Sequence, residues 1–477
     1  MSLHAPSIPM SAAAADRLRS VRARPFGLYL HVPFCATRCG YCDFNTYTAG
    51  ELGSSTSPAA WAEAVRRELD QAAALLAPAR PVETVFVGGG TPSLLGADGL
   101  AGLLGAVRSS FGLAPGAEVT TESNPESTSP EFFAALREAG YTRISLGMQS
   151  AAPHVLRILE RRHTPGRAPA AAHEAAAAGF EHVNLDLIYG TPGETDDDLA
   201  ASLDAVLATP VDHVSAYALI VEDGTAFARK VRRGEVPMPD DDVLAARYEL
   251  IDARLSAAGL TWYEVSNWAS VARQDLSVGT SERLGKRSRV AESAVRQARA
   301  PQLVEPVETP DPDSVCRHAP QLVEPVETPD PDSVCRHAPQ LVEPVEMPDP
   351  DSVCRHNEAY WRSDDWWGIG PGAHSHVNGV RWWNQKHPAT YAASLESGSL
   401  PVGGFELLSD DDVHTEAVML RTRMRSGLPV AELSGDEARR AERAVSDGLL
   451  VVVDDAYVLT DPGRLLADGV IRDILVE

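Results

Sequence analysis

One short stretch with three cysteines decides how the rest of the chain is interpreted: YLHVPFCATRCGYCDF, residues 29–44. Cys35, Cys39 and Cys42 follow a C-x3-C-x2-C spacing, and a short apolar run over residues 27–32 leads into them. Thiolates this close together in a loop can converge on one iron–sulfur cluster. A [4Fe–4S] cluster has four irons, so three thiolates leave one iron open to an outside ligand.

Two other interpretations of the cysteines remain open at this point. A structural zinc site usually has paired C-x2-C units and a fourth ligand, for which His31 is available, although it precedes the loop on a predicted strand. A disulfide is disfavoured because the cysteines of the stretch are odd in number and nothing in the sequence suggests export. The spacing favours the cluster.

Short β-branched runs alternate with helical stretches from residue 27 to about residue 221. The predicted strands are 28–32, 83–87, 118–122, 143–147, 182–189 and 213–220. The predicted helices are 58–76, 100–111, 130–139, 168–178, 196–207 and 240–258. Such alternation predicts a parallel sheet with right-handed crossovers, and six units fall short of a closed eight-unit barrel. Chemistry in barrels of this type lies at the carboxyl ends of the strands.

Polar and glycine-rich motifs follow these predicted strands. Residues 88–92, GGGTP, come after the second strand, and consecutive glycines let the backbone approach a ligand closely. Glu122 closes the third strand, Gln149 closes the fourth, and Asp186 lies in the fifth. Carboxylates on strands are costly unless they are paired or bound, so a polar ligand is expected. A tight turn and structural hydrogen bonds to loop amides are the simpler alternatives.

Residues 300–356 contain three near-identical 19-residue copies, which differ only at Met347, where the others have Thr309 and Thr328. Four prolines per copy exclude helix interiors and regular strands. Low hydrophobicity and excess acid predict a disordered tract. We interpret residues 271–352 as a duplicated insertion in a loop, because the cost of closing a loop grows slowly with its length.

Composition bounds the function. Hydrophobic residues make up 44% and charged residues 23% of the chain, as in ordinary globular proteins, and the net charge of −25 argues against a nucleic-acid surface. No apolar run approaches the roughly 20 residues of a membrane span, and the N-terminus lacks the apolar core of a secretory signal. The expected location is the cytoplasm. Peripheral membrane contact and the oligomeric state remain open.

The stretch 29–44 resembles the opening motif of the radical S-adenosylmethionine (SAM) superfamily. Its flanks, HVPFC (31–35) and GYCDF (40–44), resemble one branch, the oxygen-independent coproporphyrinogen III dehydrogenases and the related heme chaperones. The resemblance implies a partial (β/α)6 barrel whose Cys35, Cys39 and Cys42 hold the cluster, with SAM on the open iron. It also implies an electron donor, since an electron from the cluster cleaves SAM to methionine and a 5′-deoxyadenosyl radical.

The same resemblance assigns further residues. Those on SAM-binding positions are Tyr29, Tyr41, Gly89, Gly90, Thr91, Glu122, Gln149, Arg161, Asp186 and Ile220, of which Tyr29 is an aromatic residue behind those that contact SAM. Residues 356–361, HNEAYW, match the His-Asn-x-x-Tyr-Trp signature of the heme chaperones, which implies His356 as a heme ligand. Imidazole is a common axial ligand of heme, and aromatic side chains stack on porphyrins. The alternative is that His356 caps a loop while the aromatic residues pack against the barrel.

Two sequence features distinguish the heme chaperones of this branch, which carry heme, from the dehydrogenases, which are enzymes. Phe44 stands where the dehydrogenases have a further cysteine, and only 28 residues precede Tyr29, whereas the dehydrogenases have a longer substrate-covering segment. We therefore expect a heme chaperone that delivers heme to respiratory hemoproteins, with no catalytic residue assigned. The alternatives are a dehydrogenase that converts two propionates of coproporphyrinogen III to vinyls in porphyrin biosynthesis, and a radical SAM reaction on another substrate.

The expected organisation of the chain has five parts. They are a disordered tail (1–26), the barrel (27–270), the insertion (271–352), a barrel-associated region with the HNxxYW signature (353–404), and a small α+β, winged-helix-like C-terminal domain (405–477). A hairpin is predicted in the last part at 449–453 and 456–460.

Overall fold

The computed structural model describes residues 9–20, 24–52, 57–78, 80–161, 163–271 and 347–476. Most of the predicted insertion, residues 272–346, lies outside the described residues.

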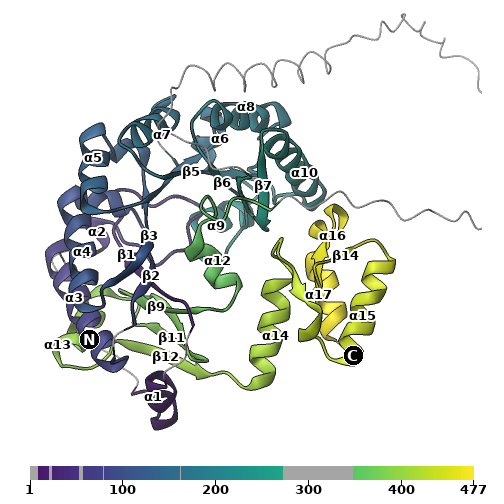
Figure 1. Cartoon of the computed structure of the whole chain (residues 1–477). Helices are drawn as coiled ribbons and strands as arrows, with labels where there is room; N and C mark the ends of the chain where they lie inside the picture. The colour runs from purple at the N-terminus through teal and green to yellow at the C-terminus, as the bar shows by residue number, and fades with distance from the viewer. Residues whose placement is uncertain are drawn as a thin grey trace, which may run out of the picture. The chain divides into compact units, whose positions relative to one another are not determined.

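Six parallel strands form the centre of the fold and confirm the predicted partial barrel (Figure 1). They lie side by side in chain order: β1 (Phe26–Val32), β2 (Val82–Gly89), β3 (Leu113–Ser123), β4 (Arg143–Gln149), β5 (His182–Tyr189) and β6 (His213–Ala218). The intervening helices cover the outside of the sheet: α3 (Pro58–Leu75), α4 (Gly96–Ser110), α5 (Pro130–Ala139), α7 (Arg167–Ala177), α8 (Asp196–Leu207) and α10 (Asp241–Ala257). Each predicted strand and helix is confirmed to within five residues, the largest difference being the earlier start of β3.

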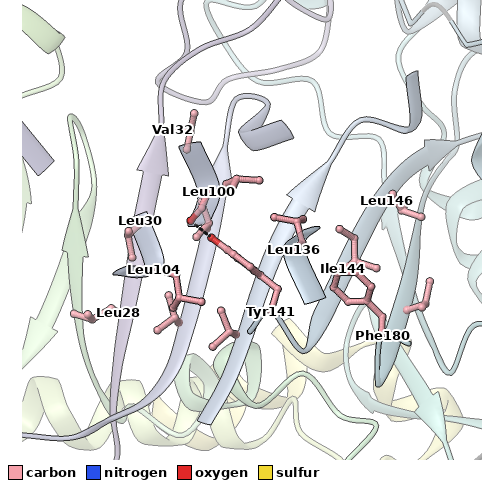
Figure 2. Packing of buried hydrophobic residues seen from close by; sticks show 14 of the residues in the cluster. Leu28, Leu30, Val32, Leu100, Leu104, Leu136, Tyr141, Ile144, Leu146 and Phe180 are labelled. Carbon is pink, nitrogen blue, oxygen red and sulfur yellow. Dashed lines mark hydrogen bonds between the residues drawn. The ribbon is translucent and has the colours of Figure 1, made fainter. Parts of the chain in front are cut away.

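Alternation along the strands separates the apolar outer layer from the barrel interior. Leu28, Leu30 and Val32 of β1 are fully buried and belong to the same apolar core as Leu100 and Leu104 of α4 (Figure 2). A buried polar bond crosses this layer, because the hydroxyl of Tyr141 donates to the carbonyl of Leu100 at 2.9 Å. The alternate residues of β1, among them Tyr29 and His31, therefore face the interior.

Further strands extend the sheet at both edges, which the sequence did not predict. Next to β1 lie β9 (Asp365–Ile369), β10 (His374–Val377), β11 (Val380–Asn384) and β12 (Val402–Leu407), and next to β6 lie β8 (Asn267–Ser270) and β7 (Leu260–Glu264). Of these added strands, β9 runs parallel to β1, and β8 runs antiparallel to β6.

A buried ion pair closes the amino-terminal end of the barrel. The Nε atom of Arg143 donates to Glu118 at 3.1 Å, and the two side chains are only 1% and 3% exposed. Arg143 also donates to the carbonyls of residues 351–353, and Glu118 accepts from the backbone N–H of His356 at 3.0 Å. Burial alone would raise the pKa of Glu118. The charge of Arg143 and the backbone N–H groups of His356 and Arg355 outweigh burial and lower this pKa. Together they dock helix α12 (Arg355–Trp361) against the barrel base.

The chain on either side of the insertion meets at one place. The backbone N–H of Asp349 donates to the carbonyl of Ser270 at 2.8 Å, and the hydroxyl of Ser352 donates to the same carbonyl at 2.8 Å. Ser352 is 2% exposed. Residues 349–352, which the sequence analysis assigned to the insertion, are therefore packed against the barrel.

The prediction of a disordered tail over residues 1–26 is wrong for residues 12–19. Residues 12–19 form helix α1 (Ala12–Arg19), capped by Ser11, and Ala14 and Leu18 are buried in the main core. The side-chain amide of Asn378 donates to three carbonyls around the end of α1, those of Arg17, Leu18 and Ser20. An alanine-rich segment with one leucine gives a weak signal, and tertiary packing decides its structure.

The C-terminal part combines helices with a small antiparallel sheet, as predicted. Its elements are α14 (Asp410–Arg421), β13 (Leu428–Pro429), α15 (Gly435–Ser446), β14 (Leu450–Val453), β15 (Ala456–Leu459), α16 (Asp461–Leu465) and α17 (Ala467–Leu475). The predicted hairpin is confirmed as β14 and β15. Among the described helices, none combines the length and the apolar character needed to cross a membrane.

We predict that Arg143→Met lowers the free energy of unfolding by about 3–5 kcal/mol, because it leaves the Glu118 carboxylate buried without its counterion. The control is Arg232→Met, which breaks the exposed Arg232–Asp223 pair, with side chains 59% and 99% exposed, and should cost less than about 1 kcal/mol. Urea unfolding followed by circular dichroism measures both. Equal losses in the two variants would contradict the structural role of the buried pair.

Candidate cofactor site

A cavity of about 910 Å³ lies at the carboxyl ends of the six parallel strands. Its walls come from the loop after β1 and from the ends of β2 to β6, with α10 and α16 closing one side. This is the place at which parallel α/β sheets bind their ligands, because the loops that follow neighbouring strands converge there.

The three cysteines of the loop after β1 all line this cavity. Backbone hydrogen bonds hold the loop at both ends. The N–H of Cys35 donates to the carbonyl of Tyr47 at 3.0 Å, and the N–H of Tyr47 donates to the carbonyl of Pro33 at 2.7 Å. In the middle, Gly40 N–H donates to the carbonyl of Leu159 at 3.4 Å. The thiols are partly exposed toward the cavity, so the loop presents all three on one wall.

The glycine motif after β2 packs directly against the cysteine loop. Gly90 N–H donates to the carbonyl of Val32 at 2.7 Å, and a Cβ atom at position 90 would lie 2.5 Å from the carbonyl oxygen of Phe34 and 3.0 Å from the sulfur of Cys35. Gly89 has φ +111°, in the region that side chains disfavour. The glycines are therefore required by the close approach of two strand ends, and Gly89, Gly90 and Thr91 line the cavity.

Glu122 connects the third strand to this motif. Its Oε2 atom accepts from Gly89 N–H at 3.0 Å, and the carboxylate faces the cavity. Burial and then the charge of Asp186 raise the pKa of Glu122 to about 8, although the Gly89 bond lowers it. A carboxyl group held in this way is ready to ionise when a cation enters the cavity.

Asp186 lies on the same wall in a network of neutral donors. Its carboxylate accepts from the hydroxyl of Ser145 at 3.0 Å and from the side-chain amide of Asn184 at 2.6 Å. Burial raises the pKa of Asp186, and these donors oppose the shift. Hydrogen bonds within the sheet, the simpler of the two interpretations, therefore account for part of the environment of Asp186. The same side chain also lines the cavity.

Arg161 and Gln149 complete the fourth-strand side. The Nη1 atom of Arg161 donates to the sulfur of Cys39 at 3.4 Å, its Nη2 atom donates to the carbonyl of Gly147 at 3.2 Å, and its buried Nε atom has no partner among the described residues. Gln149 has a left-handed φ of 67° at the strand end. The guanidinium lies where it can stabilise thiolates and ligand oxygens.

The structure brings together all but two of the predicted site residues. Those that line the cavity are Cys35, Cys39, Tyr41, Cys42, Gly89, Gly90, Thr91, Glu122, Gln149, Arg161, Asp186 and Ile220. Tyr29 is not among the lining residues. Its hydroxyl lies 3.1 Å from the Nδ1 atom of His31, inside the barrel, and its ring stacks on Phe86.

His356 lies at the barrel base and not at the cavity. Its side chain is 1% exposed, with Nδ1 2.8 Å from the hydroxyl of Thr84 and Nε2 2.9 Å from the hydroxyl of Tyr360. Burial lowers the pKa of His356 to about 4, despite the charge of Glu118. Both ring nitrogens are therefore occupied by protein groups, and a heme iron has no access to them in this conformation.

Sequence reasoning missed several lining residues. His163 lines the cavity with a buried Nε2 atom that has no partner among the described residues. Tyr217, at the end of β6, also lines the cavity and is 45% exposed. Arg464 and Leu465 come from α16, far away in the sequence. The alternation of residues along β6 could have predicted that Tyr217 lines the cavity, whereas no local sequence pattern identifies Arg464 as a lining residue.

The three cysteines suit the ligand pattern of an iron–sulfur cluster. Their thiols lie on one wall of the cavity, and the ligands of a [4Fe–4S] cluster are spread around a cube. The Nη1 atom of Arg161 donates to the sulfur of Cys39, so a cation lies beside one of the three thiols.

Comparisons with known proteins agree with the geometry. Residues 29–206 match the family model of the Radical SAM superfamily. The chain is 53% identical over 458 residues to the heme chaperone HemW of Mycobacterium tuberculosis (strain H37Rv), covering 96% of this chain and 97% of that protein. It is 36% identical over 255 residues to heme chaperone HemW of Escherichia coli K12, covering 53% of this chain and 65% of that protein.

A solved structure matches almost the whole chain. It is coproporphyrinogen III oxidase (HemN) from Escherichia coli, with a TM-score of 0.70 over 98% of this chain and 94% of that one. The sequence identity is 20%, so this likeness shows the fold alone.

We predict that Glu122→Gln flattens the pH dependence of stability. Native Glu122 keeps its proton up to a pKa of about 8, whereas an unfolded glutamate loses it near ~4.3, so the stability that this proton contributes is lost as the pH rises between the two values. Glutamine does not titrate, so the variant should lose less stability than the parent from pH 6 to pH 8. Thermal melts at both pH values measure this.

Glu138→Gln, at an exposed position of α5, is the matched control and should keep the parental pH slope. The same slope in Glu122→Gln as in the parent would show that Glu122 is ionised in the folded protein.

Proposed function

The chain belongs to the Radical SAM superfamily and, within it, to the heme chaperone HemW family, and on that premise we propose that it binds a [4Fe–4S] cluster, SAM and heme and delivers heme to hemoproteins. The observation that carries the proposal is the cavity at the strand ends, where the three cysteines and nearly all predicted SAM residues lie together.

In this proposal Cys35, Cys39 and Cys42 hold the cluster through their thiolates. Arg161 beside Cys39 offsets part of the negative charge that three thiolates bring to one wall. When bound and reduced, a cluster of this kind supplies an electron to the sulfonium group of SAM. We further propose that a separate electron donor reduces the cluster.

SAM suits the charges and shape of the rest of the cavity. The lining residues carry more carboxylates than guanidinium groups, which favours a ligand with sulfonium and ammonium charges. We assign Glu122, next to the Gly89–Gly90 turn, to the methionyl ammonium, and Gln149 and Asp186 to the ribose hydroxyls. Tyr41 and Ile220 provide apolar walls.

Phe44 supports the carrier over the dehydrogenase. It stands where the dehydrogenases have a further cysteine, it lines the cavity, and it is 54% exposed. A phenylalanine offers no thiol to the reaction, and its exposed ring adds an apolar surface beside the cysteine loop.

Heme ligation by His356 requires α12 to move. The ring must give up its bonds to Thr84 and Tyr360 before a nitrogen can reach iron. Each such bond is worth about 0.5–1.5 kcal/mol net, so the ring can be released at moderate cost. Asn357 adds a further bond, since its amide donates to Glu264 at 3.0 Å.

The remaining parts of the proposal concern partners and place. We propose respiratory hemoproteins as heme acceptors and the cytoplasm as the location, since an oxygen-labile cluster and reduced thiols suit a reducing compartment.

The proposal is tested by measuring heme binding and coproporphyrinogen III turnover on one anaerobically reconstituted preparation. We expect a Soret shift on heme addition and no protoporphyrinogen with SAM and reductant. His356→Ala should weaken heme binding about tenfold or more. Tyr360→Phe should instead strengthen it several-fold, because removing the hydroxyl frees the Nε2 atom of His356.

Protoporphyrinogen formation would overturn the carrier proposal in favour of the dehydrogenase. Unchanged heme binding in both variants would remove His356 as the ligand while leaving the carrier proposal intact.

A further inference from the structure

A second cavity, of about 460 Å³, lies at the amino-terminal face of the barrel, at the end opposite to the cysteines. Its walls come from segments that precede or begin β1, β2 and β3, together with the first residue of α12. Pro81, Ala114 and Pro115 form its apolar walls. Three arginines and one carboxylate contribute its charges: Arg24, Arg80, Arg355 and Glu83.

The three arginines are not equivalent. Arg80 is committed to the protein, because its guanidinium pairs with the buried Asp365 at 2.7 Å and lies over the ring of Phe26. The guanidinium groups of Arg24 and Arg355 donate to backbone carbonyls, those of Ser363 at 3.4 Å and Gly116 at 2.6 Å.

Among the described residues, the guanidinium of neither Arg24 nor Arg355 forms a salt bridge within 4.0 Å, although Arg24 interacts electrostatically with Asp364 and Arg355 with Glu118. Glu83 lines the same cavity without reaching either of them. Two guanidinium groups without a directly paired carboxylate thus face one concavity in a chain whose net charge is −25.

We propose that this cavity binds an anionic ligand of the carboxylate or phosphate type through Arg24 and Arg355, with Arg80 as a fixed wall. Guanidinium groups bind both kinds of oxyanion in a planar, bidentate manner, and a partly enclosed, low-dielectric wall strengthens the bond. The ligand is small, because the cavity lies toward the lower end of the ~300–1,000 Å³ that small-molecule sites occupy.

Two sources supply this chemistry. One is a free small anion. The other is the propionate groups of heme, which rests on the proposed function, because Arg355 directly precedes His356 in α12. A ligand bound at Arg355 would contact the helix that carries the predicted heme signature.

The first arm of the test measures anion binding to the full chain. Phosphate and citrate should raise the melting temperature above that in chloride of equal ionic strength. In Arg24→Gln/Arg355→Gln the affinity should fall by about tenfold or more. Glu83→Gln removes the carboxylate that lines the cavity and should tighten anion binding, an effect that a purely structural role of these residues does not produce.

Arg66→Gln is the matched control, since it removes the same charge from an exposed position on α3 and should leave anion binding unchanged. The second arm compares heme with heme dimethyl ester, whose propionates are uncharged. Weaker binding of heme but not of the ester in Arg24→Gln/Arg355→Gln identifies the propionates as the ligand. A response to phosphate or citrate alone identifies a free anion.

The proposal is overturned if neither free anions nor heme respond to the arginine substitutions. Absence of heme binding in the parent protein would count against the proposed function, and the phosphate and citrate arm would still decide the anion site.

Discussion

The close approach of two strand ends is the constraint on which the site depends. Gly90 N–H donates to Val32 and Thr91 N–H donates to Phe34, at 2.7 and 2.8 Å, so the glycine turn after β2 fixes the backbone that leads into Cys35. Position 90 has no room for a side chain. The Glu122 bond to Gly89 then adds the third strand. Motifs far apart in the sequence therefore behave as one structural unit.

The two ends of the barrel are built differently. The carboxyl end is a wide cavity with partly exposed thiols, whereas the amino end is closed by α12 and the buried Glu118–Arg143 pair. Packed groups join the two ends. His356 stacks on Phe86 at 5.4 Å and Phe86 on Tyr29 at 6.2 Å, the Tyr29 hydroxyl contacts His31, and His31 Nε2 lies 2.9 Å from the carbonyl of Asn45 in the cysteine loop. A displacement of α12 would thus alter the packing beneath the cysteine loop.

Local periodicity was sufficient to predict the barrel and most of its cavity. Strand and helix patterns repeat clearly over residues 27–258, and parallel strands bring the residues after each of them to one edge, so Glu122, Gln149 and Asp186 could be placed together. The burial of His356 was not predictable, because α12 docks against the barrel base through contacts between segments far apart in the sequence. Tyr29, which the resemblance implied to be an aromatic residue behind those that contact SAM, lies inside the barrel and not on the cavity wall. Helix α1 and strands β9 to β12 depend on long-range contacts that leave no local pattern.

The central claim is that three thiols hold a cluster whose open iron binds SAM, and electron paramagnetic resonance of the reduced, anaerobically reconstituted protein tests it most directly. The account predicts a [4Fe–4S] signal that changes on addition of SAM and is lost in Cys39→Ala. It should persist in Cys354→Ala, since that cysteine is buried at the barrel base beside Glu118. Zinc in place of iron, or a signal indifferent to SAM, would contradict the account.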